Sequence, residues 1–215
     1  MTASTPSDVR AIELYSHGAE TFVAAECWHG IVDKNLADWE AEWLPDLQNR
    51  LKLLNQRGVE RRFWPQSRHW DWRVKLRDIE KRLANRSFAL VCEGMTQAMM
   101  TVDLTKRARL AGQQTQHLVY IDYIEAAPWN RNDLLGAPPR YRGCGTELIL
   151  AAIELSIAEG YKGRVGLHSL PQANRFYANH CGMEDLGQDA AYEDLRYFEL
   201  SSEQAQKFIG KGQGE

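Results

Sequence analysis

The 215-residue sequence has no hydrophobic run long enough to cross a membrane. Its longest uninterrupted apolar stretch, residues 148–153, is six residues long, whereas a membrane-spanning helix needs roughly 18. The first eight residues are polar and lack the apolar core of a secretory signal peptide. From these absences we expect a soluble protein that stays in the cytoplasm and does not associate with membranes.

Cysteine and histidine are too few and too scattered for a disulfide framework or a metal site. The 4 cysteines contain no Cys-x-x-Cys pair, and the 6 histidines contain no His-x-x-x-His arrangement. Disulfide scaffolds and structural zinc sites need denser, patterned spacing. We therefore expect free thiols in a reducing compartment and no metal cofactor. The cysteines are Cys27, Cys92, Cys144 and Cys181.

The net charge of −3 is unevenly distributed along the chain. Residues 57–86 hold ten Arg or Lys against four acids, which makes this segment +6 and the rest of the chain −9. Phe63, Trp64, Trp70 and Trp72 are interleaved with the cations. Such a mixture is able to bind nucleic acid or an acidic ligand through charge and stacking. The acidic balance of the whole chain favours the other interpretation, an amphipathic helix with its tryptophans facing the core.

Two helices are predicted in the first half, after short strands at 11–15 and 21–25. The first helix covers 33–56, where apolar residues recur every three or four positions. We expect a cap at Asp33, a bend or a split at Pro45 and an end at Gly58. The second helix covers 67–84. Its expected apolar side consists of Trp70, Val74, Leu76, Ile79 and Leu83.

The second half alternates strands and helices. Strands at 88–93 and 97–104 are joined by a tight turn at Glu93-Gly94, and a third strand covers 117–126. A helix over 146–159 ends at Gly160 and is followed by a strand at 164–168, a short helix at 171–180 and a strand at 195–200. The fold class is therefore mixed α/β, with helices around one sheet. Since no repeat or linker interrupts the sequence, we expect a single domain over 1–215, with a helical elaboration at about 33–86 and frayed ends at 1–9 and 207–215.

The segment that carries chemistry is Arg140-Tyr141-Arg142-Gly143-Cys144-Gly145-Thr146, between a strand and an apolar-faced helix. Glycines without Cβ atoms let backbone N–H groups approach an anion, and the first turn of a helix adds unpaired N–H groups and the positive end of its dipole. A phosphate is the natural ligand of such a turn. The Walker loop does not fit, because Thr and Glu follow Gly145, and the dinucleotide fingerprint does not fit, because position 148 is leucine.

This arrangement resembles the acyl-CoA loop of the GNAT N-acetyltransferase superfamily, which has Arg-x-x-Gly-x-Gly between a strand and a helix. The downstream chain is also similar, with a strand at 163–168, the aromatic pair Phe176-Tyr177 and the step Cys181-Gly182. The resemblance covers about 87–200, while the helices at 33–86 match only in number and order. It implies a central mixed, splayed sheet flanked by helices.

The resemblance also implies a reaction and its residues. Acetyl-CoA would donate an acetyl group directly to a primary amine. Backbone groups of Glu125, Ala126 and Ala127 would bind its pantetheine arm, as would the Asn174 side chain, since the family's usual asparagine position is Leu170 here. The pyrophosphate would lie against the N–H groups of 141–146, with Arg140 and Arg142 adding charge.

Two proton transfers accompany this reaction. Tyr177 matches the family's tyrosine and would protonate the departing thiolate. Glu125 is our choice of base for the acceptor ammonium, with Asp122, His168 or a chain of waters as the alternatives. The segment 129–139 lengthens the usual connection, and it either covers the acceptor pocket or is a surface excursion. The interval from Tyr177 to Gly182 is also one residue longer than usual.

The expected partner is a small-molecule or peptide amine, and a homodimer is our working assumption. Two other functions stay open. One is a GNAT-like module that binds CoA or a partner without catalysis. The other is an acetyltransferase directed to RNA or aminoacyl-tRNA that uses the basic, aromatic segment 57–86.

Overall fold

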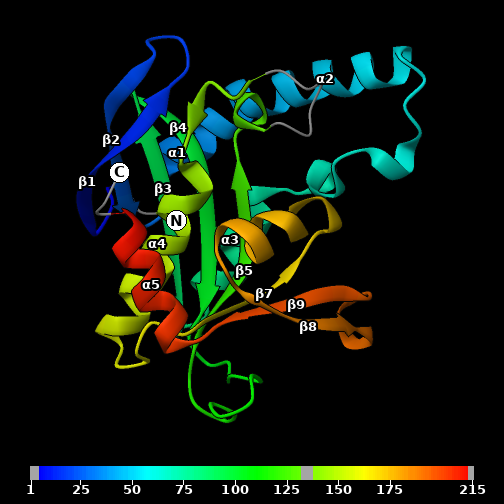
Figure 1. The fold of residues 1–215 in the computed structure, drawn as a ribbon. Coiled ribbons are helices and arrows are strands. Elements are labelled where there is room, and N and C mark those ends of the chain that lie inside the picture. The colour runs from blue at the N-terminus through cyan, green and yellow to red at the C-terminus, as the bar shows by residue number, and fades with distance from the viewer. Residues whose placement is uncertain (1–4, 132–137, 213–215) are drawn as a thin grey trace. The chain divides into compact units, whose positions relative to one another are not determined.

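The computed structural model describes residues 5–131 and 138–212 (Figure 1). The strands are β1 (Asp8–Ser16), β2 (Thr21–His29), β3 (Asn85–Cys92), β4 (Met95–Asp103), β5 (Val119–Ala126), β6 (Tyr141–Arg142), β7 (Val165–Ser169), β8 (Glu184–Asp189) and β9 (Leu195–Leu200). The helices are α1 (Asp33–Asp38), α2 (Leu44–Gln56), α3 (Trp72–Glu80), α4 (Cys144–Ala158) and α5 (Ser202–Gly212).

The strands form one mixed sheet, which confirms the predicted fold class. Their hydrogen-bonded order is β6-β1-β2-β3-β4-β5-β7-β9-β8. The pair β5 and β7 is parallel, while β1–β2, β1–β6, β2–β3, β7–β9 and β8–β9 are antiparallel. The chain divides into two compact units, which are described in turn. The first contains the described residues of 1–100 and 124–148, and the second contains 101–123 and the described residues from 149 onward. The expectation of a single domain stays a prediction.

The first unit is built on two hairpins and the helical segment between them. The β1–β2 hairpin runs in register from Asp8 opposite His29 to Ser16 opposite Thr21, so both strands are longer than predicted. The predicted turn between β3 and β4 is confirmed. Glu93 and Gly94 have φ angles of 51° and 73°, the left-handed pair that a tight two-residue hairpin turn requires.

The predicted helix over 33–56 is split into α1 and α2 by a π-helical turn. Residues 39–43 form a π-helical turn between α1 and α2, in which the Leu44 N–H donates to the Trp39 carbonyl. Pro45 follows directly and has no N–H to offer the preceding turn. The π turn absorbs this missing hydrogen bond, so the helical direction continues through to Gln56. Val32, not Asp33, is the residue before the first turn.

The predicted helix over 67–84 is wrong in its bounds and in part of its buried face. Residues 61–63 and 66–69 form 3₁₀ turns, and α3 begins only after Asp71, whose carboxylate accepts the Val74 N–H at 3.0 Å. Trp72 is fully buried, whereas the side chain of Val74 is 43% exposed and that of Leu83 is 98% exposed. The buried face consists of Trp72, Leu76 and Ile79, which are spaced at i, i+4 and i+7, and Leu83 lies beyond the end of the helix.

In the second unit, β7 is flanked by β5 on one side and by β9 on the other. The parallel pairing with β5 covers only Val119–Ile121 opposite Val165–Leu167, although both strands continue beyond it. The early end of this ladder agrees with the splayed strand that the resemblance implies. The predicted helix over 171–180 is a 3₁₀ turn at Pro171–Ala173 followed by a π turn at Phe176–His180.

Parts of the two segments predicted to be frayed, 1–9 and 207–215, belong to regular elements. Strand β1 already begins at Asp8, and α5 continues to Gly212 with Ala205 and Phe208 buried. Residues 1–4 and 213–215 lie outside the described residues. All four cysteines are free and buried. No helix in the described part of the chain is long and apolar enough to cross a membrane.

Candidate active site

The predicted anion-binding turn lies at the first turn of α4. The helix begins at Cys144, two residues earlier than expected, and the Glu147 N–H donates to the Gly143 carbonyl at 2.9 Å. Gly143 has a φ of +99°, which a residue with a Cβ adopts only under strain. The N–H groups of Cys144 and Gly145 belong to the first turn of the helix, before its i→i−4 hydrogen bonds begin. Arg140 and Arg142 are exposed beside this turn.

The remaining loop residues divide between strand and helix. Gly145 and Thr146 are the second and third residues of α4 and are half-buried. The Cys144 side chain is buried, and burial raises the pKa of its thiol to about 12. A thiol that stays protonated is a poor nucleophile.

The edge of the N-terminal hairpin holds the turn, a contact that the sequence does not predict. Strand β6 pairs with the end of β1, with Arg142 opposite Tyr15 and Tyr141 opposite Ser16. The His17 N–H also donates to the Arg140 carbonyl at 3.0 Å. Such pairing joins segments about 125 residues apart, and a two-residue strand leaves no periodic signal in a sequence.

Two predicted backbone contacts to the cofactor are already occupied by the protein itself. The Tyr141 N–H donates to Asn130 Oδ1 at 2.9 Å. The Ala127 N–H donates to the Gln97 carbonyl at 2.9 Å, and its own carbonyl accepts the Asn130 N–H at 2.8 Å. These N–H groups of Tyr141 and Ala127 are therefore engaged within the protein and are not available to a cofactor.

Glu125 is a buried carboxylate with two strong partners. Its Oε2 accepts the Trp72 indole N–H at 2.8 Å, and its Oε1 lies 3.3 Å from an Arg131 guanidinium nitrogen. The Glu125 side chain is only 9% exposed. Burial raises the pKa of Glu125, and the charge of Arg131 with the hydrogen bonds from Trp72 and Ser67 opposes that rise. The group is a stronger base than an exposed carboxylate, but it is also anchored. Asp122, the alternative base on β5, is half-buried.

Replacing Glu125 by glutamine should destabilise the protein by about 3 kcal/mol, because the Arg131 charge then lacks its buried partner. Unfolding in urea measures this loss. The matched control is Glu40→Gln, which breaks an exposed carboxylate–guanidinium pair with Arg73. Its loss should be much smaller, because water screens exposed charges. If both variants lost the same free energy of unfolding, the buried character of the Glu125–Arg131 pair would be contradicted.

Tyr177 and Asn174 belong to the second unit. The Tyr177 side chain is buried and packs its ring against Phe176 and Phe198, with centroid distances of 5.2 and 5.9 Å. Burial raises the pKa of Tyr177, so its phenol stays protonated and able to donate. Asn174 Oδ1 is buried and has no hydrogen-bond partner in the described part of the chain. A buried orphan acceptor is costly, which makes it a candidate to accept an N–H from a ligand.

His168, the other alternative base, has both ring nitrogens engaged. Nε2 lies 3.0 Å from Asp189 Oδ2, and Nδ1 lies 2.6 Å from the Tyr120 hydroxyl. The ring also stacks on Tyr192 at 3.8 Å, and the side chain is 3% exposed. Hydrogen bonds from Arg109 and His168 lower the pKa of Asp189 to about 2. With Asp189 ionised, His168 donates from Nε2 and accepts the Tyr120 proton at Nδ1, so it serves structure better than proton transfer.

Acid should destabilise the protein through His168. Burial lowers the pKa of this imidazole, with Asp189 opposing part of the effect. The unfolded chain then binds a proton near pH 6.5 that the folded chain does not, so stability falls as pH drops below about 6.5, by at most about 1.4 kcal/mol per pH unit. Urea unfolding between pH 7.5 and 5 measures the slope. The slope should weaken in His168→Gln but persist in the control His69→Gln, which alters an exposed histidine. An identical slope in all three proteins would contradict the assignment.

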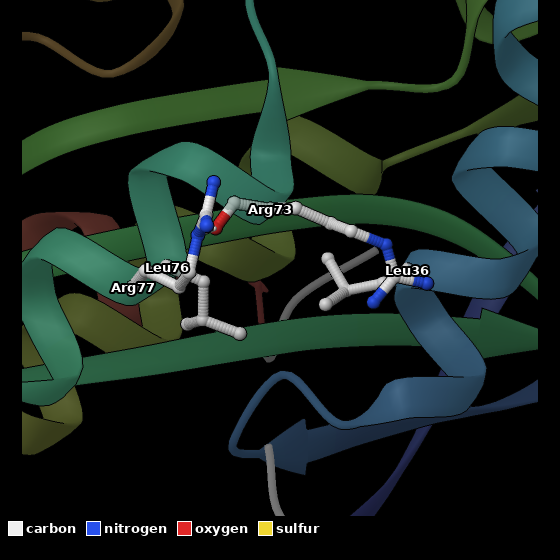
Figure 2. A pocket seen from close by; sticks show the side chains of 4 residues that line it. All are labelled: Leu36, Arg73, Leu76 and Arg77. Carbon is white, nitrogen blue, oxygen red and sulfur yellow. Dashed lines mark hydrogen bonds between the residues drawn. The ribbon is translucent and has the colours of Figure 1, made fainter. Parts of the chain in front are cut away.

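A hollow of about 220 Å³ lies elsewhere in the first unit, between α1 and α3 (Figure 2). Leu36 and Leu76 form its apolar lining, and Arg73 extends toward Leu36. Arg73 is held by Glu40 in a two-pronged contact, at 2.5 and 2.8 Å. None of the predicted site residues lines this hollow.

Some expectations lie outside what the structure describes. The proposed role of 129–139 as a pocket cover depends on residues 132–137, which are not among the described residues. Within the described ranges 5–131 and 138–212, no group of three or more His, Cys, Asp or Glu side chains is arranged to hold a metal ion.

Known proteins resemble this chain in structure but not in sequence. No protein-family model matches it, and neither does any curated protein sequence. An uncharacterized protein from Bacillus halodurans superposes with a TM-score of 0.53 at 10% identity, covering 96% of this chain and 95% of its own. RimJ from Mycobacterium smegmatis, in complex with CoA-disulfide, superposes with a TM-score of 0.47 at 16% identity, and the match covers 95% of each chain. The Bacillus subtilis N-acetyltransferase YlbP, in complex with coenzyme A, superposes with a TM-score of 0.40 at 12% identity, and the match covers 61% of this chain and 82% of its own.

The fold of this chain is mixed α/β and is similar to that of the Bacillus halodurans protein. The order of strands and helices, the parallel pair β5–β7 and the glycine turn that opens α4 agree with the arrangement that the sequence predicts. At 10% identity the likeness to the Bacillus halodurans protein concerns the fold alone.

Proposed function

We propose that this protein is an acyl-CoA-dependent N-acyltransferase that transfers an acetyl group from acetyl-CoA to a primary amine. The observation that carries the proposal is the glycine turn at Gly143, which opens α4 beside two exposed arginines within a GNAT-like fold. In this proposal the N–H groups after Gly143, with Arg140 and Arg142, bind the pyrophosphate of the donor.

The chemistry requires two proton transfers and no redox step. The neutral amine attacks the thioester carbonyl, a C–N bond forms and the C–S bond breaks. The acceptor ammonium has a solution pKa of about 10 when it is a lysine, and Glu125 takes its proton either directly or through water. Tyr177, whose phenol stays protonated, gives a proton to the departing CoA thiolate. The product amide and free CoA then leave.

The acceptor is a small-molecule or peptide amine in this proposal. One observation favours an RNA acceptor as the second candidate. Phe63 is 65% exposed, and the Arg62 guanidinium carbon lies 4.8 Å from its ring centroid. An exposed aromatic beside a cation is suited to stacking on a base. RNA binding that weakens steeply with salt would support this candidate, and its absence would remove it.

The test is release of free CoA thiol from acetyl-CoA in the presence of a panel of amines, including amino acids, peptides and polyamines. The proposal predicts thiol release that depends on one class of amine, with a matching mass increase of an acetyl group on that amine. Tight binding of acetyl-CoA without transfer to any amine or RNA would instead identify a binding module.

A further inference from the structure

We propose that Asn130 is a positioning residue that holds the phosphate-binding turn in place, so that the turn does not depend on the inserted segment that precedes it. This inference rests on the proposed function. It concerns a residue that neither the glycine motif nor the sequence pattern identifies. Asn130 ends the short 3₁₀ turn Pro128–Asn130 after β5, and Arg140 is ten residues later in the chain.

The two ends of the inserted segment are tied together at its base. The Arg140 N–H donates to the Trp129 carbonyl at 3.0 Å, and the Tyr141 N–H donates to Asn130 Oδ1 at 2.9 Å. These two hydrogen bonds place residues 129–130 beside residues 140–141. The turn therefore begins from a defined point at Tyr141, whatever the conformation between the two ends.

The other end of the Asn130 amide reaches the core and the helix. Its Nδ2 donates to Gln97 Oε1 at 2.9 Å and lies 3.7 Å from Cys144 Sγ, at the first residue of α4. Gln97 is 1% exposed in β4. One side chain thus touches the residue before the glycine turn, the residue after it and a buried strand.

The neighbouring groups fix the orientation of the amide. The Trp129 indole N–H can only donate, and it lies 2.8 Å from Gln97 Oε1, so that Gln97 atom is an oxygen. The Asn130 atom that faces the same oxygen must then be the Nδ2 donor, which leaves Oδ1 for the Tyr141 N–H. Aspartate is isosteric but would place an oxygen against an oxygen. The site therefore requires asparagine rather than any polar side chain of that size.

The test compares two acetyl donors in the wild type and in Asn130→Asp. Acetyl-CoA carries the pyrophosphate, whereas acetyl-pantetheine ends before it. We expect Asn130→Asp to weaken acetyl-CoA binding about 10- to 100-fold in calorimetric titration, because the backbone N–H groups that bind the pyrophosphate are then displaced. Turnover of saturating acetyl-pantetheine should stay within about twofold of the wild type. Gln97→Leu should reproduce the effect, and the double variant should be no worse than either single one, because both act through the same contact. Asn49→Asp, an exposed asparagine in α2, is the matched control and should bind normally.

Each outcome decides the inference. Wild-type affinity for acetyl-CoA in a folded Asn130→Asp variant overturns it and leaves the proposed function intact. Equal losses with both donors also overturn it, because the residue would then be merely structural. If the wild type binds no acetyl-CoA, the proposed function and this inference both fail. If Asn130→Asp does not fold, the test becomes hydrogen exchange of the Tyr141 amide in Gln97→Leu. Protection of that amide equal to its protection in the wild type would contradict the proposal.

Discussion

Replacing Gly143 by glutamate should weaken acetyl-CoA binding at least about 100-fold. The residue has a φ of +99°, where an L side chain costs roughly 1–3 kcal/mol. A Cβ at this position would lie 3.5 Å from Leu14 Cδ2, an ordinary contact, so the strain comes from the backbone and not from a clash. The added carboxylate would also repel the donor's pyrophosphate. Calorimetric titration of a folded variant measures the loss.

A matched control separates backbone strain from loss of the site. Gly187 has a φ of +91°, and a Cβ there would meet no atom within 4 Å. Gly187→Glu therefore introduces the same charge and similar strain in β8, which belongs to the second unit. It should be destabilised to a similar extent and still bind acetyl-CoA normally. Equal affinity in both variants would mean that the turn at Gly143 does not receive the pyrophosphate.

Replacing Tyr177 by phenylalanine should lower kcat about 100-fold and leave KM for acetyl-CoA nearly unchanged. The substitution removes only the hydroxyl, so the ring contacts with Phe176 and Phe198 remain. A positioned proton donor contributes roughly 10²–10⁴-fold to a reaction of this kind. Steady-state kinetics with the acceptor found in the amine screen provides the measurement.

The control for this variant is Tyr161→Phe, which deletes a hydroxyl that donates to the Leu104 carbonyl at 3.4 Å. It should keep wild-type kcat, because this hydroxyl supports the fold and not the reaction. If Tyr177→Phe retains full kcat, then another group or water protonates the thiolate. A rise in KM at constant kcat would make Tyr177 a binding residue instead.

Local signals in the sequence predict much of the fold. The Glu93-Gly94 turn, the alternation around it and the glycine-rich entry to α4 depend on residues close together in the chain, and the structure has all three. The error at α3 arises from competition between local signals. The apolar spacing from Trp70 to Leu83 is helical, but Pro65 and the Asp71 cap delay the helix, so part of that spacing faces solvent.

The environment of the candidate site depends on contacts that no local pattern carries. Glu125 gains Trp72, more than fifty residues earlier, as a hydrogen-bond donor. The amide of Asn130 is oriented by Gln97, which is buried beside it in β4. Sequence periodicity indicates which face of an element is apolar, but it does not identify which buried polar groups meet.

Calorimetric titration of the wild-type protein with acetyl-CoA tests the central claim most directly. We expect saturable binding with a micromolar dissociation constant, which is a binding free energy of about −8 kcal/mol. Acetyl-pantetheine, which lacks the pyrophosphate, should bind more weakly. If the folded protein gave no binding heat with millimolar acetyl-CoA, the proposed acyl-CoA site would be contradicted. The glycine turn would then be a structural feature of α4 and not a cofactor site.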